Sequence, residues 1–441
     1  MATTLDSATS EALETHVSVS SNFSLGSYPG SCESHWLIQS ERNTRHFMST
    51  GVSSMTLKSM LWLVVLATSA LGSMPTLSKF GGVSLSGVIT AGVALSALIV
   101  FLLKPMLYKN SIKAILAVLA FWILSLGSYF GFYPEVQKGI QNYPIVWGGM
   151  LFLLLSFSNS YFSHNSVASI SKLLIRLCGW LYCITLLFMY FHEGVDPAGA
   201  LAGIFFFCFA LSELYHGKQG SIFLIVCILV VQILMGARIV IIAEVFIFFF
   251  GNILLYGLKE RPYDFMRKSS SKVLSIMAVL VGVFVIMHTG FLDKSIAGGD
   301  QALVIGGVQF NTSGRMYMWG VVLDSALASP WLGHGTPGPA IMLETPRWSH
   351  PHNDYLRIFH QFGVLGLIIW SVFIWQGLKH SRFAAKFSPV PEGRLLSKAA
   401  YFSLIGLSLA MITDNPIVYS YVVYPIFALL GVAFSYSANC K

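Results

Sequence analysis

Residues 220–257 read GSIFLIVCILVVQILMGARIVIIAEVFIFFFGNILLYG. The stretch contains two apolar runs, 220–236 and 238–257, each close to the roughly 20 residues that a helix needs to cross a bilayer. The second run opens directly with Arg238, after a short Met-Gly-Ala turn. This pattern predicts two consecutive transmembrane helices joined by a tight turn.

Apolar runs of this length recur along the whole chain. Of its 441 residues, 55% are hydrophobic and 10% are charged, and the mean hydropathy is +0.69. A soluble domain carries about 25% charged residues, so this composition indicates a polytopic membrane protein. We predict an all-α fold with about 12 transmembrane helices. The predicted spans are 58–74, 84–103, 112–131, 145–162, 173–191, 198–215, 220–236, 238–257, 272–290, 362–378, 396–413 and 417–436.

The loops between these spans separate by charge. The formal net charge is +8, and the basic residues gather in short loops that alternate with loops poor in lysine and arginine. This alternation follows the positive-inside rule, and it argues against a nucleic-acid partner. Both termini are therefore predicted to be cytoplasmic, and one long loop between spans 9 and 10, residues 291–361, is predicted on the outer face. The basic loops contain Lys104, Lys109 and Lys113; Lys172 and Arg176; Lys218; Lys259, Arg261, Arg267, Lys268 and Lys272; and Lys379, Arg382, Lys386, Arg394 and Lys398.

Three regions follow from this reading. Residues 1–55 are rich in serine and threonine and lack a secretory signal pattern, so we expect a disordered cytoplasmic tail. Residues 56–436 form the transmembrane domain, and 437–441 form a short cytoplasmic tail. None of the six cysteines lies in a predicted outer loop, so no disulfide framework or thiolate metal site is implied. The chain also lacks a phosphate-binding glycine-rich loop, which argues against the use of ATP.

Arg315 is the first candidate functional residue in the long predicted outer loop. Residues 314–328 are predicted to form a helix along the membrane surface, because four apolar residues repeat there at helical spacing. Arg315 falls in the first turn, where free backbone N–H groups favour an anion. Arg315 is thus a candidate phosphate ligand, and the alternative is a surface arginine that reaches lipid phosphates. The apolar residues of the repeat are Met316, Trp319, Leu323 and Leu327.

Three other polar residues are candidates of unequal strength. Arg238 could extend to the lipid headgroups, but its place inside a span makes it a functional candidate. Glu244 lies about 9 Å deeper in the same span, at ~1.5 Å of rise per residue, and is expected to pair with a cation or to be protonated. His334 sits in the Pro/Gly-rich turn 329–339, and we expect a structural rather than a catalytic role for it.

His352 is the candidate general base. In His350-Pro351-His352-Asn353, Pro351 keeps the chain extended before the next helix, which Asn353 or His352 can cap. At a helix N-terminus the dipole disfavours a protonated imidazole, and a neutral imidazole suits a general base. The alternative is a capping or packing histidine. A zinc site is not expected, because no cysteine or third histidine lies close in the sequence.

These residues together form a recognisable pattern. The chain resembles the O-antigen ligase and Wzy-type polysaccharide polymerase superfamily of bacterial inner membranes. The motifs cover about 235–370, and the number of spans and the late outer loop extend the resemblance loosely over about 60–436. They are specific for the superfamily but do not choose among its members. The motifs are Gly236-Ala237-Arg238, Arg315 with Trp319, Pro330-Trp331-Leu332-Gly333-His334-Gly335, and His352-Asn353-Asp354-Tyr355-Leu356 with Gly363 and Gly366.

The resemblance implies a GT-C-like glycosyltransferase that is inverting and metal-independent and needs no cofactor. Its donor would be a polyprenyl-diphosphate-linked glycan at the periplasmic face of the bacterial inner membrane. By position, His352 matches the histidine proposed as general base, and Arg238 and Arg315 match the arginines that hold the donor diphosphate. Trp319 and Asn353, in the same motifs, are expected to bind substrate.

The predicted functions differ in the molecule that accepts the glycan. The first is a polymerase that joins lipid-linked repeat units of an exopolysaccharide or O-antigen, and the alternative is a ligase that moves the glycan to lipid A–core. Both transfer to a sugar hydroxyl, and both imply membrane lipids, a flippase and chain-length or export proteins as partners. A lipid-linked glycan flippase is a contrasting class that fits the same spans. It would usually place polar residues near the midplane of several spans, whereas here they gather in one outer loop.

Overall fold

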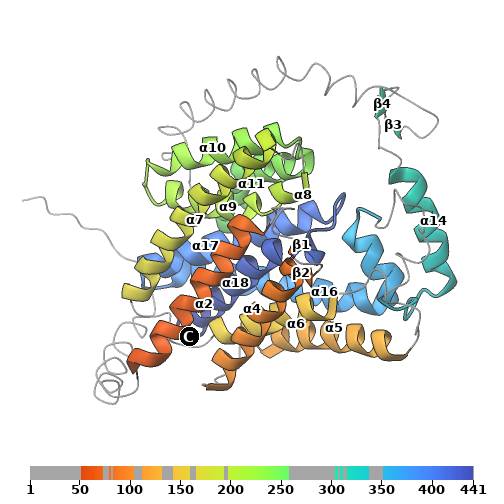
Figure 1. Cartoon of the computed structure of the whole chain (residues 1–441), viewed down its shortest axis with the longest axis horizontal. Coiled ribbons are helices and arrows are strands. Elements are labelled where there is room, and N and C mark those ends of the chain that lie inside the picture. The colour runs from red at the N-terminus through yellow and green to blue at the C-terminus, as the bar shows by residue number, and fades with distance from the viewer. Residues whose placement is uncertain are drawn as a thin grey trace, which may run out of the picture. The chain divides into compact units, whose positions relative to one another are not determined.

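The computed structural model describes residues 51–72, 79–80, 83–103, 112–131, 143–158, 165–192, 197–257, 303–305, 308–310, 315–336 and 351–440. The chain divides into two compact units, Met1–His46 and Phe47–Lys441, and every element below belongs to the second. The described residues are almost entirely helical (Figure 1). The exceptions are two short antiparallel hairpins, in which β1 (Lys79–Phe80) pairs with β2 (Val83–Ser84) and β3 (Leu303–Ile305) with β4 (Val308–Phe310).

Each predicted span other than 272–290 overlaps a described helix, and 272–290 lies outside the described residues. Two bounds differ clearly: 198–215 is divided between two helices, and 362–378 lies within a helix of 34 residues. By length and composition, five described helices could cross a membrane, and five further apolar helices are shorter. The predicted tail 1–55 lies outside the described residues up to residue 50, and α2 begins at Gly51. The helices are α2 (Gly51–Leu71), α4 (Leu85–Leu103), α5 (Ile112–Gly131), α6 (Tyr143–Phe157), α7 (Asn165–His192), α8 (Pro197–Ala200), α9 (Gly203–Tyr215), α10 (Ser221–Leu234), α11 (Arg238–Tyr256), α14 (Arg315–Ala328), α16 (Asp354–Phe387), α17 (Pro391–Ala410), the 3-10 turn η3 (Pro416–Val418) and α18 (Ser420–Asn439).

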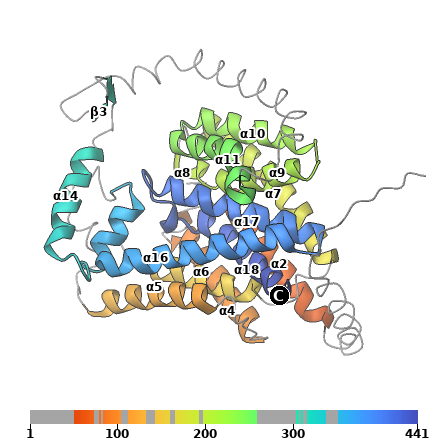
Figure 2. The same cartoon turned by 180° about the vertical axis from the view of Figure 1, so that it is seen from behind.

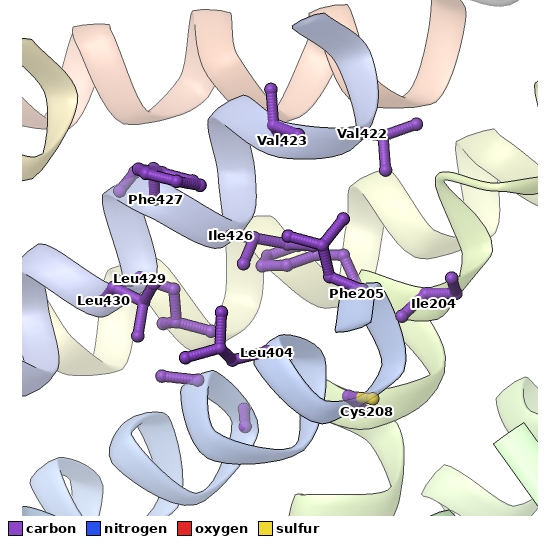
Figure 3. Close-up of a cluster of buried hydrophobic side chains, with 14 of the residues drawn as sticks. Ile204, Phe205, Cys208, Leu404, Val422, Val423, Ile426, Phe427, Leu429 and Leu430 are labelled. Atoms are coloured by element: carbon purple, nitrogen blue, oxygen red, sulfur yellow. The ribbon is translucent and has the colours of Figure 1, made fainter. Parts of the chain in front are cut away.

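The core of the bundle is built on α9, α17 and α18. Side chains such as Phe205, Leu404 and Ile426 are fully buried and gather in one cluster from the three helices (Figure 3). Helices inside a membrane associate through close packing rather than water exclusion, and small residues let them approach. Gly406 on α17 packs against Ile204 in this way, with no room for a larger side chain. The three helices therefore form a close-packed frame.

Helix α16 is broken where it meets the Pro/Gly-rich turn. Gly363 has φ +60 and ψ −160, which interrupts the helical path near the predicted start of the span. The freed backbone groups pair with the turn, because Val364 N donates to Pro330 O at 2.8 Å and His334 N donates to His360 O at 2.8 Å. A Cβ atom at Gly363 would collide with the backbone of Trp331. The predicted Pro/Gly-rich turn thus packs against α16 at the point where Gly363 interrupts the helix.

The long helix α16 links the outer loop to the frame. Figures 1 and 2 both show it running alongside α5, with α14 beside its N-terminal part. The contact with α14 includes Met318 and Val322, which are buried against Leu356 on α16. The stretch that begins α16 therefore lies where α14 and the frame meet.

Candidate active site

Arg238 opens helix α11 at the tip of a tight turn. Gly236 has φ +65, and the turn closes through Ala237 N donating to Gln232 O at 3.0 Å. The predicted tight turn between two apolar helices is confirmed. The guanidinium of Arg238 is half-buried at a helix N-terminus, where backbone N–H groups and the helix dipole favour an anion.

Arg315 is likewise the first residue of its helix, α14, which begins one residue after the predicted start. Its positive charge acts unfavourably on that of Arg238. Two arginines distant in sequence are therefore near enough for their like charges to repel each other, each in the first turn of a helix. Like charges brought together raise the free energy unless an anion lies between them.

Helix α14 turns one face to the protein and another outward. Its buried residues are Met318, Val322 and Ala326. In the repeat that predicted this helix, Leu323 and Leu327 are exposed, with exposed fractions of 42% and 57%. This exposed apolar face fits the expected position along a membrane surface.

Trp319 lies one turn after Arg315 and connects α14 to the histidine loop. Its indole Nε1 donates a hydrogen bond of 2.7 Å to the carbonyl oxygen of Pro351, the residue before His352. Trp319 was predicted to bind substrate, and its one indole donor is used to hold this loop. The bond places the helix of Arg315 directly beside the candidate base.

His352 stands at the start of α16 in a left-handed backbone conformation. Its φ of +49 is the only positive φ of a non-glycine residue in the described parts of the chain. Such strain costs about 1–3 kcal/mol and clusters at functional sites. Asn353 is the helix cap, since its Oδ1 accepts a hydrogen bond of 2.9 Å from Leu356 N. The capping alternative for His352 is therefore wrong. Asn353, which was predicted to bind substrate, uses its side-chain oxygen for the cap.

The partner of His352 is Asp414, which the sequence motifs did not single out. His352 Nδ1 lies 3.4 Å from Asp414 Oδ1, and the imidazole keeps 39% of its surface exposed. Asp414 belongs to the segment between α17 and η3, and its Oδ1 also accepts a hydrogen bond of 2.8 Å from Asn415 N. A carboxylate at Nδ1 fixes the proton on that nitrogen and leaves Nε2 as the basic atom. The one feature of the sequence that could have indicated Asp414 was the presence of an acidic residue in a short loop predicted on the outer face.

The other polar candidates have structural partners. His334 Nε2 lies 2.7 Å from Ser325 O, and its ring packs at a tilt against that of His360, with 4.8 Å between centroids. The expected structural role of His334 is supported by this packing between α14 and α16. Glu244 is fully buried, and Gln232 Nε2 donates to its Oε1 at 2.8 Å. The contact partner of Glu244 is thus a neutral amide, which agrees with the second of the two predicted alternatives, a protonated carboxyl, better than with pairing to a cation.

The fold and the site together define a class of protein. It is a polytopic helical protein whose site contains two arginines and a histidine–carboxylate pair. Residues 223–371 match a family model described as O-Antigen ligase, which confirms the predicted O-antigen ligase and Wzy-type superfamily over about a third of the chain. No curated protein matches the chain. The matched region contains Arg238, Arg315 and His352 but ends before Asp414.

Proposed function

We propose that the protein is a membrane glycosyltransferase that joins polyprenyl-diphosphate-linked oligosaccharide units into a surface polysaccharide. The observation that carries this proposal is the like-charged pair Arg238 and Arg315 at two helix N-termini. A diphosphate is the group that such a pair would bind best, because guanidinium groups grip phosphate oxygens with two parallel hydrogen bonds and stay charged.

In the proposed reaction, His352 Nε2 takes the proton from the acceptor hydroxyl while Asp414 stabilises the imidazolium that forms. The hydroxyl oxygen bonds to the anomeric carbon as the bond from that carbon to the donor phosphate oxygen breaks. A single displacement of this kind inverts the configuration. General-base assistance is typically worth ~10²–10⁴ in rate.

The leaving diphosphate gains negative charge in the transition state. Arg238 and Arg315 are placed to stabilise that charge without reorganisation, which is usually the largest contribution of an enzyme to the rate. We propose that the two guanidinium groups supply the positive charge for which many enzymes of this chemistry use a divalent cation. The reaction would then proceed in the presence of a chelator.

A ligase that transfers the glycan to lipid A–core is the second candidate. The description of the matching family, O-Antigen ligase, favours it, while the proposed chemistry is the same for both acceptors. The polymerase and the ligase differ only in the acceptor of the glycan. Purified protein given one labelled donor would lengthen lipid-linked glycan if it is a polymerase, and would label added lipid A–core if it is a ligase.

His352→Ala tests the shared chemistry. We expect glycan transfer by the purified protein to fall by ~10² or more, because the base is lost. His216→Ala is the matched control, since it removes a half-buried histidine that lies in the short loop between α9 and α10. Full activity of His352→Ala would contradict the general-base role, and loss of wild-type activity on adding chelator would contradict the metal-independent reaction.

A further inference from the structure

The first turn of α16 contains a buried ion pair. Arg357 Nη1 lies 3.3 Å from Asp354 Oδ1, and the two side chains are 1% and 0% exposed. Removing two charges from solvent is costly, and a buried pair is seldom more stabilising than apolar residues of the same size. A contribution to stability therefore does not explain why this buried ion pair is present.

Asp354 holds the segment that carries Asp414. Its backbone N–H donates to Met411 O at 2.9 Å, and its Oδ2 accepts a hydrogen bond of 2.9 Å from Ile417 N. These two anchor points lie on either side of Asp414 in the chain. One residue thus fixes both ends of the segment whose middle faces His352.

The charges of this region depend on one another. Burial raises the pKa of Asp354, the attraction of Arg357 lowers it, and the nearby carboxylate of Asp414 raises it. The buried guanidinium therefore favours the charged form of Asp354 against both its burial and its neighbour. An apolar pair in place of Asp354 and Arg357 could fill the space, but it could not accept the Ile417 N–H group.

We propose that Asp354 is a positioning residue, which holds Asp414 in the place from which Asp414 orients His352. Arg357 neutralises Asp354 so that it can do this beside a second carboxylate. The inference rests on the proposed function, since it needs His352 to act as a base. It also extends the working site beyond the matched residues 223–371, into the segment between α17 and α18.

A double-mutant cycle tests this proposal with the full chain in detergent. Asp414→Asn and Asp354→Leu are each expected to lower kcat for glycan transfer ~10-fold or more, with KM for the donor unchanged within about twofold. Leucine cannot accept the Ile417 N–H group, so it removes the side-chain anchor. In the Asp414→Asn background, Asp354→Leu should have little further effect, because the action of Asp354 passes through Asp414. Equal losses from Asp354→Leu in both backgrounds would overturn the proposal, since a merely structural residue would behave in that way.

A second variant guards against misfolding caused by an unpaired buried arginine. Asp354→Leu with Arg357→Met removes both charges together, which is often tolerated where removal of one is not. We expect this variant to unfold near the wild-type temperature and to show the kcat loss and the dependence on Asp414 of the single variant. Wild-type kcat in this folded variant would also overturn the proposal. His352→Ala with full activity would instead remove the proposed function, so the two failures are distinguishable.

Discussion

The two ends of the helical bundle use charge in opposite ways. At the end predicted to be cytoplasmic, cations meet carboxylates: Lys172 Nζ lies 2.8 Å from Glu392 Oε1, and Arg176 Nη2 lies 2.5 Å from Glu213 Oε1. At the outer end, Arg238 lies beside Arg315, a charge of the same sign. Opposite charges join helices, whereas like charges held together prepare a place for an anion.

The inner pairs have a structural explanation that needs no ligand. Glu213 on α9 is buried, and it is satisfied by Arg176 on α7 and by Ser221 on α10, whose Oγ donates to Glu213 Oε2 at 2.9 Å. One carboxylate thus ties three helices together. Arg238 and Arg315 lie in the first turns of α11 and α14, where we propose that their like charges serve an anionic substrate.

Arginine-to-lysine changes give the largest expected difference between the two ends. Arg238→Lys and Arg315→Lys retain charge but lose the bidentate grip on phosphate, so we expect kcat/KM to fall by ~10²–10³. The matched control is Arg176→Lys at the inner end, which loses one of the two contacts with Glu213 but changes no proposed diphosphate ligand. Glycan transfer by the three purified variants checks this expectation. Equal activity in all three would remove the distinction between the ends.

A smaller effect is expected in the acid stability of the inner end. Burial lowers the pKa of His216 from 6.5 to about 4, with further lowering by the charges of Lys398, Arg394 and Lys172. The unfolded histidine binds a proton first as the pH falls, so stability is full above about 6.5 and declines toward pH 4. We expect His216 to account for about 1–2 kcal/mol of this decline, after allowance for its partial exposure.

The comparison that isolates this effect is thermal unfolding of wild type and His216→Gln between pH 7 and pH 4. The variant should lose less stability than wild type over this interval, since glutamine does not titrate. Parallel curves for the two proteins would show that His216 does not titrate as its burial requires. Activity at neutral pH should be the same in both.

Much of the helical framework could be read from apolar runs, because a bilayer requires long apolar helices with their backbone groups paired internally. The turn at Arg238 and the cap at Asn353 were also predictable, since both depend on residues close in sequence. Local rules of this kind do not predict contacts between residues that are distant in the sequence. They predicted where Arg238, Arg315 and His352 lie along the chain, but not which of them meet.

The remaining features depend on packing between distant segments. Asp414 reaches His352 only because the first turn of α16 binds the segment after α17. Gly363 breaks α16 because the turn at Trp331 occupies the space a side chain would need. The left-handed backbone of His352 is likewise imposed by its surroundings, as histidine has no strong preference for that conformation. Such details of the site could not be obtained from periodicity or spacing.

The central claim is that Arg238 and Arg315 together form a diphosphate site. The most direct measurement is thermal unfolding of wild type and of the Arg238→Gln, Arg315→Gln double variant, titrated with inorganic pyrophosphate and with a short polyprenyl diphosphate in a phosphate-free detergent. We expect both ligands to raise the unfolding temperature of wild type and to leave that of the double variant unchanged. Equal shifts in the two proteins, or the same shift of wild type with phosphatidylglycerol, would contradict it, the latter because the arginines would then bind lipid phosphates.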